Sequence, residues 1–262
     1  MARRGALAAS NSTVFLVMQL GSLGAALLAG PLLSGHSSPL PFTVLAGFFL
    51  VSAGCLSSIP RGSISHNVAG SKDSALRIDQ HFLRLVAVYA LLYGSAVLVS
   101  VMGSTFVFEE HKGTATDFGY LEAAWSAGSL VGAALLANLT KAISAHTLHL
   151  SVLGATALGL MALISVRAPW TLIIFATLGL LYNLGRVSIE VTLQSRVCDS
   201  ALGRAKGVMH SLAVALGLLV FGITAAGGND VFPSTIFFGF GVVLLISTFA
   251  LSIGVVQQKG QW

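Results

Sequence analysis

Charged residues are scarce in this chain. Only 9% of its 262 residues are Asp, Glu, Lys or Arg, whereas about 25% is usual for a soluble domain. The hydrophobic share is 55% and the mean hydropathy is +0.87. A water-soluble fold is therefore excluded. The composition indicates an integral membrane protein, and its 29 glycines agree with the frequency of glycine in membrane helices.

Several functional signatures are also missing. The two cysteines, Cys55 and Cys198, are too far apart in the sequence to suggest a disulfide or zinc motif. No phosphate-binding loop G-x-x-x-x-G-K-[ST] occurs. His146 and His149 are close together but have no accompanying carboxylate. We expect no enzymatic activity, no cofactor and no metal. Because the basic residues do not cluster, we also expect no nucleic-acid partner.

Long apolar runs are abundant. A membrane-spanning helix needs about 20 apolar residues, about twice the length of a spanning strand. The sequence therefore predicts an all-α integral membrane protein with about eight transmembrane helices. The runs are Thr13–Leu33, Phe42–Ile59, Leu85–Phe108, Phe118–Leu139, Thr147–Val166, Trp170–Leu193, Val208–Gly227 and Phe232–Val256.

The distribution of Lys and Arg predicts the orientation, since cytoplasmic loops are enriched in both. With the N-terminus inside, eleven of the fourteen basic residues lie on the cytoplasmic side and only Lys112 and Arg167 lie outside. Arg186 falls within a helix. The eleven are Arg3, Arg4, Arg61, Lys72, Arg77, Arg84, Lys141, Arg196, Arg204, Lys206 and Lys259. We expect a multi-pass protein of the cell membrane with both termini in the cytoplasm.

The longest connection, residues 60–84, is polar, basic and rich in Gly and Ser. It predicts a cytoplasmic linker between a helix pair in residues 1–59 and a six-helix bundle in residues 85–256. Residues 257–262 would form a cytoplasmic tail.

Two stretches are rich in small residues. The stretch 20–35 contains Gly30, Pro31 and Gly35, which suit either general helix packing or a gate between two halves of a transporter. Gly128 and Gly132 form a G-x-x-x-G packing face. Glu122, on the same helix, either lines an outward-facing cavity and exchanges a proton or reaches water at the membrane interface.

Arg186 and Glu190 are four residues apart in the sixth run and therefore share one helix face. Charges inside a membrane helix are candidates for function. The alternative is that both side chains snorkel toward the cytoplasm. The following stretch, 194–208, predicts a tight cytoplasmic turn between two helices, with Gln194, Asp199, Gly203 and Arg204 as its motif residues.

These motifs together resemble the major facilitator superfamily, in particular its drug- and siderophore-exporter-like branch. GPLLSG is similar to the end of the glycine-proline motif in that family's fifth helix, and RRGALAASN to the basic loop before it. GYLEAAWSAGSLVGAALLA is similar to the seventh-to-eighth helix region, and TLQSRVCDSALGRAKGV to the loop after the tenth helix. The resemblance covers essentially the whole chain.

Two features depart from the family pattern. Residues 137–146 lack the charges of the family's signature inter-helix loop. The family has twelve helices, so by this alignment the first four are absent, which implies a truncated gene model, a split gene or a fragment.

The resemblance implies proton-coupled efflux of a small molecule by alternating access, with substrate bound between two six-helix bundles. The implied partners are the lipid bilayer, a small-molecule substrate, protons, and a missing N-terminal half or a second copy. The implied substrate or proton pathway residues are Gln19, Tyr89, Tyr93, Glu122, Trp125, Tyr182, Asn183, Arg186 and Glu190. The alternative is a non-transporting membrane remnant or a helical scaffold.

The charge distribution generates a topology prediction. In a variant lacking Cys55 and Cys198, a single cysteine at Ser71 should resist a membrane-impermeant maleimide in intact cells and react after permeabilisation, because the linker is expected to be cytoplasmic. Labelling of Ser71→Cys from outside would reverse the orientation.

Overall fold

The computed structural model describes residue 13 and residues 16–28, 39–58, 78–226 and 231–259. The elements are α2 (Pro39–Ser57), α3 (Gln80–Thr105), a π-helical turn η1 (Phe106–Glu110), α4 (Ala115–Ala142), α5 (Ala145–Ala162), α6 (Trp170–Arg196), α7 (Asp199–Ala226) and α8 (Pro233–Lys259). An apolar helix, Leu16–Leu28, precedes them. The expected all-α fold is confirmed.

Five helical segments are long and apolar enough to cross a membrane. They are Gln80–Glu110, Ala145–Ala162, Trp170–Arg196, Ser200–Ala226 and Pro233–Ile253. The apolar helices Leu16–Leu28 and Phe42–Ser57 are shorter, and α4 is not among the five. The chain is thus a multi-pass membrane protein by length and composition. The described residues support five of the eight expected spans directly.

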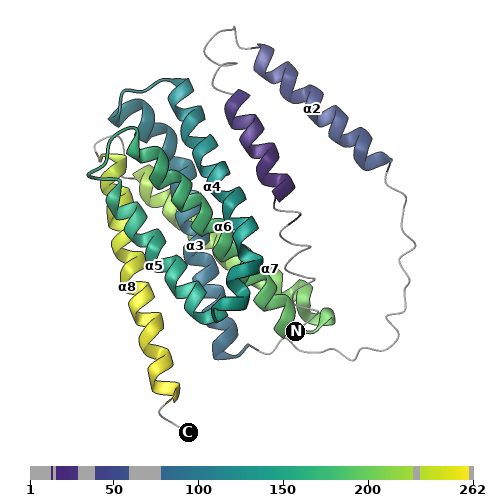
Figure 1. Ribbon diagram of the computed structural model, residues 1–262, viewed down its shortest axis with the longest axis vertical. Helices are drawn as coiled ribbons and strands as arrows, with labels where there is room; N and C mark the ends of the chain where they lie inside the picture. Colours follow the sequence, from purple (N-terminus) through teal and green to yellow (C-terminus); the bar gives the residue numbers. More distant parts are fainter. Residues whose placement is uncertain (1–12, 14–15, 29–38, 59–77, 227–230, 260–262) are drawn as a thin grey trace.

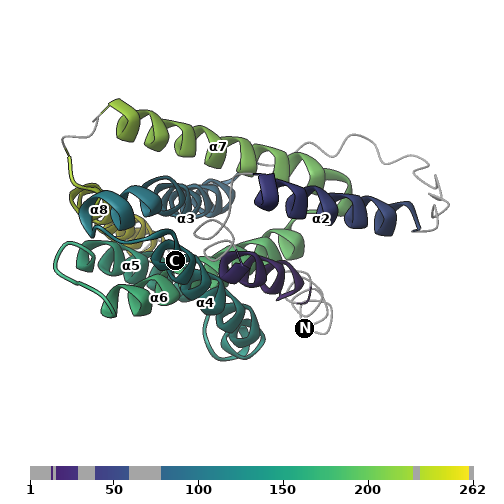
Figure 2. The same ribbon diagram turned by 90° about the horizontal axis from the view of Figure 1, so that it is seen from above.

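Helices α3 to α8 pack into one bundle (Figure 1). The most extensive interface joins α4 to α6, followed by α5 with α8 and α3 with α7. Seen from above, α7 lies along one face beside α3, while α4, α5 and α6 lie on the other side (Figure 2). Large apolar side chains such as Phe106, Phe175 and Phe237 fill the centre and are almost fully buried.

Polar caps decide where several helices begin. Asp79 Oδ1 accepts a hydrogen bond from the Phe82 amide at 2.7 Å, so α3 begins before the apolar run at Leu85. At α4, Thr114 and Asp117 form a reciprocal capping box. Hydrogen bonds from Thr114 hold the pKa of Asp117 below its ordinary value. Ser144 caps α5 through the Thr147 amide.

These helix ends correct three boundaries drawn from hydropathy. Residues 80–84 belong to α3 rather than the linker, and residues 257–259 belong to α8 rather than the tail. In the expected loop 194–208, only Val197 and Cys198 lie between α6 and α7. Hydropathy detects the apolar middle of a helix, whereas capping residues and helix formers such as Ala, Leu, Arg and Lys extend it into polar surroundings.

Glycine allows α4 and α6 to approach closely. A Cβ added at Gly128 would collide with the carbonyl of Ala176, and one at Gly132 would lie 2.5 Å from the carbonyl oxygen of Leu180. Gly179 on α6 similarly faces the carbonyl of Trp125. Ser129 Oγ donates to the Gly179 carbonyl at 3.0 Å. Small residues and hydrogen bonds between helices are typical of membrane packing, where lipid supplies little hydrophobic drive for association.

We call the α4–α6 contact at Gly128, Gly132 and Gly179 the glycine seam. It predicts that replacing a glycine by alanine destabilises the protein at the seam but not elsewhere. Gly128→Ala should lower the free energy of unfolding by about 3 kcal/mol, because the backbones must separate to admit the methyl group. A thermal or denaturant titration of the detergent-solubilised protein measures this.

The matched control is Gly222→Ala on α7, where an added Cβ meets nothing within 4 Å. It should be neutral or stabilising by a few tenths of a kcal/mol, since alanine is the better helix former. Equal losses at the two positions would show that close α4–α6 packing does not limit stability.

Candidate functional site

A cluster of charged side chains lies between α6 and α7. Arg186 Nε is 3.7 Å from Glu190 Oε1, one helical turn away on α6. Lys206 Nζ, from α7, is 3.8 Å from Glu190 Oε2. The Glu190 side chain is only 17% exposed, whereas Lys206 is 41% exposed. One carboxylate therefore bridges two cations. We call Arg186, Glu190 and Lys206 the charge cluster.

Aromatic rings border the charge cluster. The Tyr182 hydroxyl lies near Arg186, which is one turn further along α6. The rings of Tyr182 and Trp125 lie 5.8 Å apart, which links α6 to α4. Tyrosine and tryptophan combine apolar faces with one hydrogen-bonding group, so this wall can contact both apolar and polar parts of a ligand.

A second aromatic pair approaches the cluster from α3. Tyr89 interacts electrostatically with Arg186 and Glu190. Its ring stacks on Tyr93 at 6.3 Å, and Tyr93 meets His210 of α7 edge to face at 5.7 Å. Three helices thus contribute polar or aromatic groups around one carboxylate.

Asn183 connects the charge cluster to the glycine seam. Its side chain is buried, and Nδ2 donates to the Ser129 carbonyl at 2.7 Å. Its Oδ1 is buried and accepts no hydrogen bond from the residues that the structure describes. A buried acceptor without a partner is costly, so this atom is a place where a ligand or water donor would be stabilised.

The structure brings together six of the nine expected pathway residues, Tyr89, Tyr93, Trp125, Tyr182, Arg186 and Glu190, with Asn183 adjoining them. Glu122 is half-buried but lies one turn before Trp125. Because α4 and α6 run parallel along their seam, Glu122 is several turns from Glu190. Gln19 lies on the helix Leu16–Leu28, outside α3–α8.

The other expected motif residues divide into two groups. Gly30, Pro31 and Gly35 lie outside the described residues. Gln194 is in the last turn of α6, and Asp199, Gly203 and Arg204 are in the first turns of α7, so they are helical rather than loop residues.

Sequence reasoning missed Lys206 and His210 as neighbours of the site, because both were assigned to topology or left unassigned. Their spacing of four residues on a helix offered a signal comparable to that of Arg186 and Glu190. His149, which the sequence suggested only as a weak metal candidate, is buried, and its Nε2 lies 3.1 Å from Ser188 Oγ. Within the described part of the chain, no three His, Cys, Asp or Glu side chains group to hold a metal ion.

Comparison with known proteins finds no matching family, no matching curated protein and no matching solved structure. The resemblance to the major facilitator superfamily rests on the quoted motifs.

The charge cluster predicts that losing Glu190 destabilises the protein more than losing Arg186. Glu190→Gln should lower the free energy of unfolding by about 2 kcal/mol, because Arg186 and Lys206 are left facing each other without a counter-charge. Arg186→Gln should cost less, since Lys206 remains beside the carboxylate. Unfolding titrations of the three variants, including Arg186→Gln combined with Glu190→Gln, measure the coupling.

Glu109→Gln serves as the control, because Glu109 is an exposed carboxylate in the turn η1. It should leave stability unchanged. Small, additive effects at Arg186 and Glu190 would instead favour two side chains that snorkel independently.

Proposed function

We propose that this chain is a membrane transporter of the major facilitator type, which moves a small molecule by alternating access and couples efflux to protons. The observation that carries the proposal is the charge cluster, in which Glu190 bridges Arg186 and Lys206 from two helices of a membrane-spanning bundle. Ionisable groups within such segments are costly and mark substrate or ion pathways.

The neighbouring side chains supply the roles that transport needs. Glu190 is the proposed proton carrier, because protonation of its carboxylate would release both cations from their shared partner. Tyr89, Tyr182 and Trp125 are the proposed contacts for the substrate. Asn183 Oδ1 is the proposed hydrogen-bond acceptor for it.

Alternating access requires two structural units that move against each other around the site. In our proposal α3–α8 form one unit. The second unit would come from a longer form of the chain or from a second copy. With both termini in the cytoplasm, the charge cluster would lie toward the cytoplasmic half of the bundle, since α6 ends and α7 begins on that side.

A second candidate function is a helical scaffold that binds another membrane protein. The observation that favours it is the apolar surface of α2, which lies apart from the packed bundle (Figure 1). Phe48, Phe49 and Leu50 are 62%, 68% and 75% exposed. A surface of this kind suits either lipid or a partner helix.

Water access to the cluster separates these functions without knowledge of the substrate. In the background lacking Cys55 and Cys198, Tyr93→Cys should react with a charged methanethiosulfonate reagent, because a transport pathway must admit water. The control is Phe249→Cys on α8, whose side chain is 68% exposed on the bundle surface. It should resist the reagent in a lipid bilayer.

Reaction at Tyr93→Cys but not at Phe249→Cys supports an aqueous pathway. If Tyr93→Cys is inert from both sides of the membrane, the transport proposal is wrong and the scaffold remains.

A further inference from the structure

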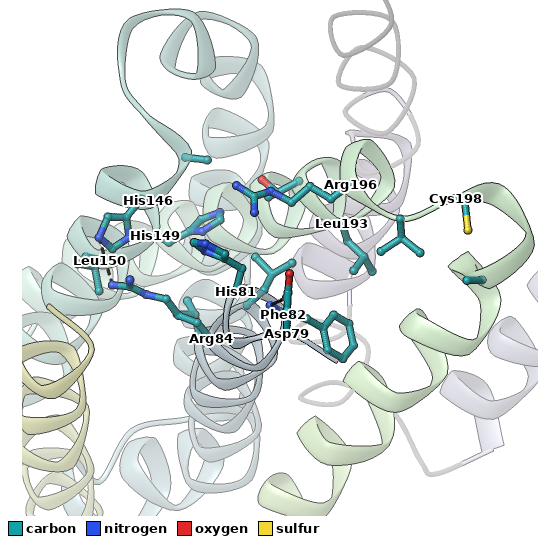
Figure 3. A pocket seen from close by; sticks show the side chains of 16 residues that line it. Asp79, His81, Phe82, Arg84, His146, His149, Leu150, Leu193, Arg196 and Cys198 are labelled. Carbon is teal, nitrogen blue, oxygen red and sulfur yellow. Dashed lines mark hydrogen bonds between the residues drawn. The ribbon is translucent and has the colours of Figure 1, made fainter. Parts of the chain in front are cut away.

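A cavity of about 420 Å³ opens at one end of the bundle, where α3 and α5 begin, α6 ends and α7 begins. Four helices supply its wall (Figure 3). The lining continues along α6 through Thr192 and Leu193, beyond Glu190 toward the helix end. The cavity is therefore distinct from the charge cluster. We call it the end cavity.

The ionisable groups of the end cavity are mainly basic. Two arginines and three histidines line it, against one carboxylate: His81, Arg84, His146, His149, Arg196 and Asp79. The Asp79 carboxylate is engaged by the α3 amide that it caps. The two guanidinium groups stay charged at any physiological pH. Their field repels cations and attracts anions.

The arginines differ in how firmly they are held. Arg84 lies 3.1 Å from His146 Nε2 and donates to the carbonyl of Leu251 on α8. Its guanidinium is therefore positioned before any ligand arrives. Arg196 is exposed and comes from the opposite wall, with its side chain directed toward His149 in Figure 3. His149 interacts electrostatically with both arginines.

Helix ends add to this field. The N-termini of α3, α5 and α7 face the end cavity through Phe82, Ala145 and Ala201, whereas only the C-terminus of α6 faces it through Arg196. Each N-terminus carries a partial positive charge of about half an elementary charge. At α3 and α5, one amide of the first turn already donates to the capping side chain of Asp79 or Ser144. Arg196 offsets the opposite dipole of α6.

We propose that the end cavity binds a phosphate group between Arg84, which is held in place by its hydrogen bonds, and Arg196, which is exposed on the opposite wall. Planar guanidinium groups bind phosphate oxygens through paired N–H donors. The group belongs either to a soluble small molecule or to a lipid headgroup, because the cavity lies at the end of helices that span a bilayer. This inference does not rest on transport, and an equilibrium measurement tests it.

The experiment uses the full chain purified in an uncharged detergent. In the first arm, sodium phosphate is titrated at constant ionic strength and binding is followed by calorimetry. In the second arm, the protein is placed in nanodiscs of phosphatidylcholine, with or without phosphatidic acid, and lipid retention is measured by mass spectrometry. A soluble ligand gives saturable binding in the first arm, and a headgroup gives selective retention of phosphatidic acid in the second.

In whichever arm shows binding, Arg196→Gln should weaken it about tenfold, because one charge-assisted hydrogen bond is lost. Arg84→Gln should weaken it at least as much. The matched control is Arg167→Gln, since Arg167 is exposed between α5 and α6 at the other end of the bundle. It should bind like the parent.

Arg196→Gln keeps the test valid if Arg84→Gln fails to fold, because the Arg196 side chain is exposed. Absence of binding in both arms, or parent-like binding by Arg196→Gln, overturns the proposal. Binding in a protein that shows no water access at Tyr93→Cys would leave the anion site standing and reject transport.

Discussion

The close approach of α4 and α6 is the contact on which the rest of the bundle depends. Gly128, Gly132 and Gly179 remove the side chains that would hold the two backbones apart. Ser129 and Asn183 add hydrogen bonds across the same seam. Since Asn183 lies one turn before Arg186, this seam also sets the position of the charge cluster. The residues that pack α6 against α4 and the charged residues of the proposed site therefore lie on the same face of α6.

The charge cluster shows how a membrane bundle can keep ionisable groups. Glu190 is only 17% exposed, but it lies within 4 Å of a cation on its own helix and another on α7. Coulomb attraction grows as the dielectric constant falls, and so does the cost of any unpaired charge.

The up-and-down order of the helices gives the two ends of the bundle different electrostatics. The helices α3, α5 and α7 all begin at the end that carries Arg84, Arg196 and the end cavity. That end combines three positive dipole ends with basic side chains. In our proposed orientation it is cytoplasmic, where excess Lys and Arg are expected in any case. The same residues can therefore serve both insertion and anion binding.

The sequence by itself determined the properties that depend on neighbours along the chain. Composition and run length predicted membrane helices, and the four-residue spacings predicted that Arg186 and Glu190 share a face, as do Gly128 and Gly132. The predicted positions of the helix ends were less accurate, because caps such as Asp79 and Thr114 act through hydrogen bonds, which hydropathy does not detect. Only the tertiary structure decided that Lys206 reaches Glu190, that His210 meets Tyr93 and that Arg84 and Arg196 face one cavity. The physical reason is that lipid and protein interior are equally apolar, so hydropathy does not reveal which face of a membrane helix meets which neighbour.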